Sequence, residues 1–165
     1  MADRTELDAY RLALGRMVDL YGHVEVYVHS CFSRIVNIPH DVADVIKAKN
    51  KAVELVKLMR SVVPMTLPSE AEEALSVFGQ FLLIAEARNK ILHRSADLTP
   101  SGTYVAWSSF ADGPHFEFTR EGLDHMSFDL YRIQFRLLRL AERSDRDKYL
   151  AVEPALFDAW RYKSL

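Results

Sequence analysis

FGQFLLIAEARNKILHR, residues 78–94, is the stretch around which this chain is organised. Its apolar residues recur at helical spacing and fill an arc of roughly 180° on a helical wheel, which is wide for a surface helix. Arg88 lies inside this arc, level with Phe81 and Ile84, where a guanidinium is costly unless it is paired and hydrogen-bonded. The stretch therefore predicts a helix with a broad buried face and a partner for Arg88.

The composition is that of one soluble globular domain. The chain has 165 residues, of which 49% are hydrophobic and 27% are charged, so it can bury a core and is too apolar for disorder. A net charge of −2 argues against a protein that coats nucleic acid nonspecifically, but it leaves room for a local basic groove. The single Cys31 excludes an intramolecular disulfide and lies on an apolar helical stripe, which predicts a buried thiol.

The N-terminus is charged from its third residue and lacks the form of a signal peptide. No uncharged run approaches the ~18 residues that a membrane span needs. We therefore expect a cytoplasmic protein that does not contact a membrane.

Hydrophobic periodicity and helix-breaking residues predict four major helices. Pro39 ends the first helix, Pro64 and Pro68 close the second, and a capping-box pattern of Ser69 and Glu72 starts the third. Thr119 is expected to cap the fourth helix. These helices are expected over residues 7–36, 41–62, 69–95 and 119–142.

Two smaller elements complete the expected fold. Strand-forming residues over 103–118, with an Asp112-Gly113 turn signal, predict a β-hairpin, and Pro154 begins a short helix over 154–162. We therefore expect an all-α single domain over 1–165, an antiparallel four-helix bundle with a small hairpin insertion. The wide apolar arc of residues 78–94 further predicts a homodimer, in which half of the arc faces a second copy.

Arg88, Asn89 and His93 form an R-N-x-x-x-H pattern near the end of the third expected helix. With this pattern the sequence resembles the HEPN family, all-helical domains that share an arginine, usually followed by a polar residue, and a histidine some four to six residues later. The resemblance implies a dimer that brings two motifs to one cleft and, in many members, RNA cleavage without a metal. Other members have no demonstrated catalysis. The hairpin departs from the general family pattern.

These residue types suit RNA cleavage. Such cleavage needs a base for the 2′-OH proton, an acid for the leaving 5′ oxygen, and positive charge beside the phosphorane. His93 can exchange protons near neutral pH, Arg88 presents a planar fork to phosphate oxygens, and Asn89 can orient ribose, phosphate or His93. Because each chain carries one motif histidine, two copies would supply base and acid together.

A purely structural role for the same residues is also open. Glu25 lies on the apolar stripe of the first expected helix, where an unpaired carboxylate would be as costly as Arg88, so we predict a Glu25–Arg88 ion pair. Such a pair could orient a catalytic arginine or only tie two helices together. His93 could cap the helix end.

Other polar residues are weaker candidates. Arg132, Arg136, Arg139 and Arg143 form a stripe that could track RNA, although such rows are more often solvated. Metal ligation by Glu25, His29, Glu86 and His93 does not fit the known helical spacings, so no metal is expected. Aromatic residues of the hairpin could stack on bases but more often pack inward. These hairpin aromatics are Tyr104, Trp107, Phe116 and Phe118.

The sequence thus predicts a metal-independent endoribonuclease without cofactors, a toxin or defence component with RNA as substrate and an antitoxin or regulatory protein as a further candidate partner. The alternative is a non-catalytic HEPN-like dimerisation or nucleotide-binding module. The expected catalytic residues are Arg88, His93 and Asn89, supported by Glu25 and Glu86. The candidate RNA-binding residues are Lys90, Arg94, Arg132, Arg136, Arg139 and Arg143.

Overall fold

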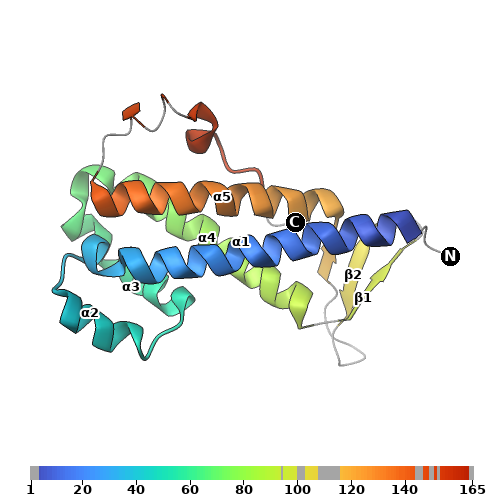
Figure 1. Cartoon of the computed structure of the whole chain (residues 1–165), viewed down its shortest axis with the longest axis horizontal. Coiled ribbons are helices and arrows are strands. Elements are labelled where there is room, and N and C mark those ends of the chain that lie inside the picture. Colours follow the sequence, from blue (N-terminus) through green and yellow to red (C-terminus); the bar gives the residue numbers. More distant parts are fainter. Residues whose placement is uncertain are drawn as a thin grey trace.

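The computed structural model describes residues 4–93, 95–99, 103–107, 116–143, 147–148, 151 and 153–163. Most of this part is helical: α1 (Arg4–Val36), α2 (His40–Lys47), α3 (Ala52–Thr66), α4 (Ala71–Leu92) and α5 (Arg120–Glu142). Two 3-10 turns, η1 (Pro68–Glu70) and η2 (Pro154–Phe157), and three short strands complete it. The predicted all-α class is confirmed, with one small sheet at the end of a helical bundle (Figure 1).

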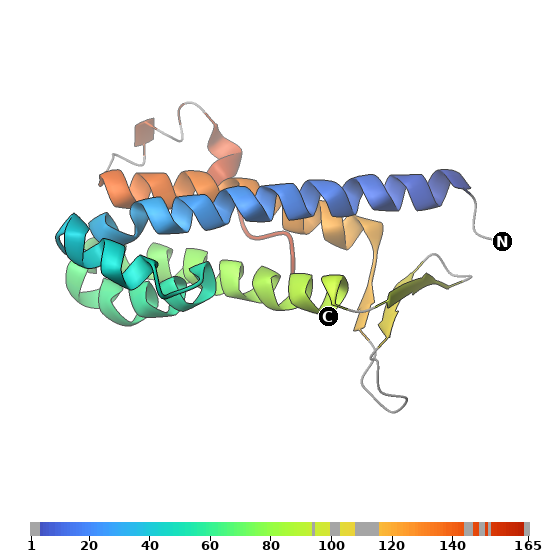
Figure 2. The same cartoon turned by 60° about the horizontal axis from the view of Figure 1, so that its bottom comes forward.

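α1 is the longest helix and packs along α5 more extensively than any other two elements pack (Figures 1 and 2). Its 33 residues extend for about 50 Å. Asn37 ends it with a left-handed φ of 58°, a conformation that asparagine tolerates better than most residues. The predicted end of the first helix is therefore confirmed.

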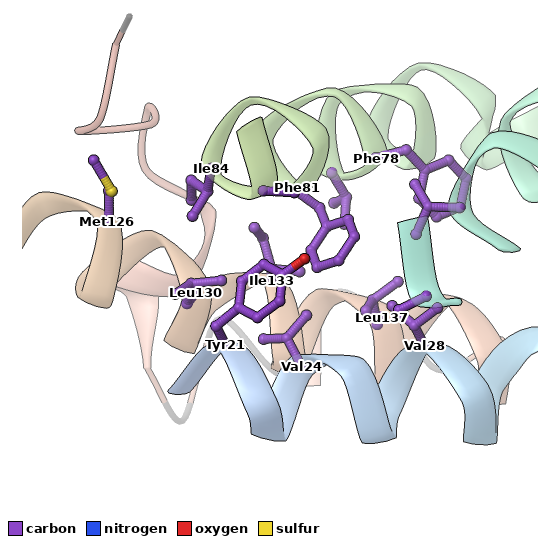
Figure 3. Close-up of a cluster of buried hydrophobic side chains, with 14 of the residues drawn as sticks. Tyr21, Val24, Val28, Phe78, Phe81, Ile84, Met126, Leu130, Ile133 and Leu137 are labelled. Atoms are coloured by element: carbon purple, nitrogen blue, oxygen red, sulfur yellow. The ribbon is translucent and has the colours of Figure 1, made fainter. Parts of the chain in front are cut away.

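The core lies where α1, α4 and α5 meet. Figure 3 shows Tyr21, Val24 and Val28 of α1 facing side chains of the other two helices. Those side chains are Phe78, Phe81 and Ile84 of α4 and Met126, Leu130, Ile133 and Leu137 of α5. The apolar arc of residues 78–94 is thus largely buried by other helices of the same chain.

The second predicted helix is in fact two, α2 and α3, separated by residues 48–51. Asn50 causes the break, because its side-chain amide donates to the carbonyl of Ile46 at 2.8 Å and competes with helical hydrogen bonding. Pro64 does not close α3 but lies inside it. The helix stops at Thr66 because Leu67 precedes Pro68 and leaves helical geometry.

The helix caps follow the prediction at one position only. The expected capping box at Ser69 is not formed: Ser69 lies in η1, and Glu70 is the N-cap of α4, without a side-chain hydrogen bond. Thr119 does cap α5, since its Oγ1 accepts a hydrogen bond from the Gly122 N–H at 3.0 Å.

The sheet contains β1 (Ser95–Leu98), β2 (Tyr104–Trp107) and β3 (Phe116–Phe118), all antiparallel and in the order β1-β2-β3. The predicted hairpin corresponds to β2 and β3, whereas β1 was not predicted. The expected Asp112-Gly113 turn lies outside the described residues. Tyr104 stacks on Tyr10 of α1 at 3.9 Å between ring centroids, so aromatic packing fixes the sheet against the start of the bundle.

The predicted C-terminal helix over 154–162 is wrong, since only η2 forms and residues 158–163 have no regular secondary structure. We call residues 154–163 the C-terminal strap. Side chains of α5 use its backbone groups: Arg132 and Arg136 both donate to the Leu156 carbonyl, and Asp129 accepts the N–H groups of Arg161 and Tyr162. Those groups are then not available for helical hydrogen bonds. None of the described helices is both long and apolar enough to span a membrane.

Candidate active site at the end of α4

The last turns of α4 carry Arg88, Asn89 and His93. Figure 2 shows this end of α4 extending beyond α2 and α3 toward the sheet. His93 is the C-cap, and its N–H donates to the Asn89 carbonyl at 3.2 Å. Asn89 and His93 are exposed and share one side of the helix, whereas Arg88 is half-buried. Solvent therefore reaches the imidazole of His93.

Arg88 is held by an aromatic ring and by its own neighbour. The guanidinium carbon lies 5.0 Å from the centroid of the Tyr21 ring, and Nη1 donates to the Asn89 Oδ1 at 3.1 Å. Tyr21 in turn stacks on Phe81 at 5.5 Å. The arginine is thus oriented from α1 through a cation–π contact, which leaves its charge unneutralised.

The predicted ion pair between Glu25 and Arg88 is wrong. Both residues lie in the described part of the chain, and no salt bridge joins them. Tyr21, one turn before Glu25, occupies the face of the guanidinium, while half-exposed Glu25 can remain hydrated. Burial and the Glu25 carboxylate raise the pKa of Tyr21 to about 12, with Arg88 acting in the opposite direction.

One donor of Arg88 is without a partner. The Nε atom is buried and makes no hydrogen bond in the described part of the chain. A buried donor of this kind is costly and calls for an explanation, such as a catalytic role, strain or a bound water or ion. Glu73 Oε1, Arg132 Nη2 and Arg139 Nε share this state. Arg88 therefore retains hydrogen-bonding capacity and a positive charge beside an exposed histidine.

The neighbouring charges on α4 pair with each other. Lys90 Nζ lies 2.6 Å from Glu86 Oε1, and this contact lowers the pKa of Glu86. Lys90 also lies 5.3 Å from the centroid of the Phe116 ring. Glu86, which was predicted to support the motif, thus forms an ion pair with Lys90. Arg94, a candidate RNA-binding residue, lies outside the described residues.

The arginine stripe of α5 is not an exposed surface. Arg132, Arg136 and Arg139 are only 0%, 6% and 2% exposed, so the expectation of a solvated or RNA-tracking row is wrong for these three. Arg143 alone is exposed. The buried guanidinium groups face the C-terminal strap and the start of α4, where backbone carbonyls and carboxylates accept most of their hydrogen bonds. Arg132 Nη2 and Arg139 Nε are buried without a partner in the described part of the chain.

Two clusters hold these arginines. Arg136 donates from Nη2 to the Asp158 carbonyl at 3.1 Å and lies 4.3 Å from the Trp160 ring. Arg139 Nη2 contacts Glu70 at 2.9 Å and Glu73 at 2.6 Å. Sequence reasoning did not identify this role, although the aromatic residues of the strap were a usable signal, because arginine stacks readily on aromatic rings.

The hairpin aromatics divide into two groups. Tyr104 and Phe118 are buried against Tyr10, as the packing interpretation expects. Phe116 is only half-buried. The side chain of Trp107 lies outside the described part.

Comparison with protein-family models, curated proteins and solved structures finds no match to this chain. In the part of the chain that is described, no group of three or more His, Cys, Asp or Glu side chains is arranged to hold a metal ion. The groups available for chemistry at the end of α4 are therefore Arg88, Asn89 and His93 with their contacts.

Proposed function

We propose that this protein is a HEPN-type endoribonuclease, a four-helix bundle that cleaves RNA without a metal ion where two copies meet. One observation carries the proposal: the half-buried Arg88 has no carboxylate partner in the described part of the chain and is instead oriented by Tyr21 and Asn89. A buried structural arginine is expected to be held by carboxylates or by several backbone carbonyls, as Arg139 and Arg136 are. The one acceptor that Arg88 contacts in the described part of the chain is Asn89 Oδ1. An arginine kept positive beside an exposed histidine suits an anionic phosphodiester.

The proposed reaction uses general acid–base catalysis. One His93 imidazole takes the proton of a ribose 2′-OH, and the freed oxygen attacks the adjacent phosphorus. Arg88 stabilises the charge on the phosphorane oxygens. The bond from phosphorus to the 5′ oxygen then breaks, and a protonated imidazole from the second copy supplies the proton to that leaving oxygen. The products are a 2′,3′-cyclic phosphate and a 5′-hydroxyl end.

The biological setting belongs to the same proposal. A cytoplasmic RNA-cleaving dimer would serve as a toxin or a defence component, and an antitoxin or regulatory protein would restrain it. A non-catalytic HEPN-like module that only dimerises or binds a nucleotide is the competing interpretation, favoured by the engagement of Arg88 with groups of its own chain.

The test is RNA cleavage in the presence of a chelator, with wild type, His93→Ala and Arg88→Ala. Matched controls are His23→Ala and Arg34→Ala, because both residues are exposed on α1, away from the motif. We expect cleavage in the wild type and both controls, and a loss of about 100-fold or more in the two motif variants. Circular dichroism must show that all proteins are folded. Equal rates in motif and control variants would overturn the nuclease, as would a wild type inactive on varied RNAs.

A further inference from the structure

A pocket of about 270 Å³ lies where β3, the start of α5 and the end of the C-terminal strap meet. Its lining includes Phe116, Met126, Glu121, His125, Arg161 and Lys163. Figures 1 and 2 place β3 and the first turn of α5 at the sheet end of the bundle, next to the C-terminal end of α4. The pocket is therefore at the same end of the molecule as the candidate active site.

Phe116 connects the pocket to the motif helix. Its ring is half-buried and lies 5.3 Å from Lys90 Nζ. Lys90 follows Asn89 directly and precedes His93 by three residues, a separation at which helical side chains lie about 5 to 6 Å apart between Cβ atoms. A strand held at His93 thus has only a short way to run before it reaches the pocket.

The lining of the pocket combines apolar, cationic and acidic side chains. Phe116 and Met126 provide an apolar interior, while Arg161 and Lys163 are exposed cations on the rim. Glu121 lies 3.7 Å from His125 and leaves carboxylate oxygen available beside the apolar part. Arg161 also lies over the Phe128 ring at 3.6 Å, so its guanidinium is held at the pocket. A hydrocarbon ligand would make no use of these charged groups.

A nucleotide of single-stranded RNA meets all three kinds of group. Its base stacks on aromatic rings, its amino groups donate to carboxylates, and its phosphates contact arginine and lysine. The volume suits a base with part of its ribose, being below the range for drug-sized ligands. We propose that this pocket is a nucleotide-binding subsite that holds a base of the RNA strand beside the cleavage site. This inference rests on the proposed function, because RNA is the substrate there.

The test measures binding without cleavage. In a His93→Ala background, fluorescence anisotropy with a short, labelled single-stranded RNA compares Phe116→Leu and Lys163→Gln with two controls. Phe135→Leu changes a half-buried aromatic outside the pocket, and Lys49→Gln changes an exposed lysine between α2 and α3. We expect about a fivefold or larger loss of affinity for Phe116→Leu, a smaller loss for Lys163→Gln, and wild-type affinity for both controls.

A second measurement does not depend on any pocket variant folding. Nucleoside 5′-monophosphates added to the His93→Ala protein should shift the amide resonances of Gly122 and Lys163, which line the pocket, and leave Lys49 unchanged. Absence of these shifts, together with control-like affinity of Phe116→Leu, would overturn the subsite.

The two proposals fail separately. If cleavage requires His93, but Phe116→Leu does not change RNA affinity and nucleotides do not shift the pocket resonances, the subsite is removed and the nuclease is kept. RNA binding that requires Phe116, in a wild type that never cleaves, would keep the subsite and remove the nuclease.

Discussion

Arg88 on α4 lies over the ring of Tyr21 on α1, with 5.0 Å between the guanidinium carbon and the ring centroid. These two residues join helices that otherwise make few close backbone contacts. The position of the arginine is therefore set by a neutral aromatic group, and a cation–π contact of this kind contributes about 0.5 to 2 kcal/mol. An anion that approaches Arg88 does not have to displace a carboxylate.

We predict that Tyr21→Phe retains RNA cleavage near the wild-type rate, whereas Tyr21→Leu lowers it by about 10-fold. Phenylalanine keeps the ring beneath Arg88, but leucine removes the contact that orients the guanidinium. Single-turnover cleavage rates of folded proteins provide the measurement. Urea unfolding serves as the control, because Tyr21 also packs on Phe81. Leu and Phe variants with the same rate would show that the ring does not position Arg88.

Asp129 is predicted to dominate the attachment of the C-terminal strap. Its carboxylate is completely buried and accepts hydrogen bonds from Gln80 and from the N–H groups of Arg161 and Tyr162. Asp129→Ala should lower the free energy of unfolding by about 3 to 5 kcal/mol, since Arg132 and these donors would lose their acceptor. Chemical denaturation measures this. Asp124→Ala, at an exposed position of the same helix, should change stability by less than about 1 kcal/mol.

Two substitutions that conserve charge, Arg136→Lys and Arg143→Lys, compare a buried with an exposed arginine of the stripe on α5. Arg136→Lys should destabilise the fold by about 1 to 3 kcal/mol, because lysine cannot reproduce the two hydrogen bonds to the Leu156 and Asp158 carbonyls. Arg143→Lys, at the exposed end of the stripe, should be nearly neutral.

Neither substitution changes net charge, so RNA affinity and its salt dependence should match wild type in both folded variants. Thermal denaturation and salt-dependent anisotropy provide the two measurements. Because lysine cannot repeat a bidentate arginine–phosphate contact, a lower RNA affinity of folded Arg136→Lys than of Arg143→Lys would indicate that Arg136 reaches RNA after all.

Local periodicity was sufficient for much of the fold. The observed bounds of α1 and α5 agree with the predicted bounds to within a few residues, because apolar spacing and capping residues determine them. The burial of Cys31 also follows from apolar spacing. The break at Asn50 was missed because a side-chain hydrogen bond to Ile46 decides it, and periodicity on either side continues unchanged.

The long-range contacts were beyond sequence reasoning for a physical reason. A helical wheel ranks Arg132, Arg136 and Arg139 as surface residues because it shows only their own helix. The burial of Arg132 and Arg136 is decided by the strap, more than ten residues further along the chain, which supplies carbonyls and rings. Arg139 is buried against Glu70 and Glu73, which lie far earlier in the chain. For the same reason, the apolar stripe indicated Glu25 as the partner of Arg88, whereas the aromatic Tyr21 one turn earlier takes that place.

Tyr21 also gives the fold a defined sensitivity to alkaline pH. Its pKa is raised from 10.0 to about 12, so the neutral phenol is favoured in the folded state. This contribution to stability is fully present below pH 10 and is lost as the pH rises through 12. We expect the free energy of unfolding to fall over this range by about 1 to 2 kcal/mol more in wild type than in Tyr21→Phe, which has no phenolic proton to lose. Urea unfolding at pH 8, 10 and 11.5 measures the difference, and parallel declines in the two proteins would show that the ionisation of Tyr21 is not coupled to folding.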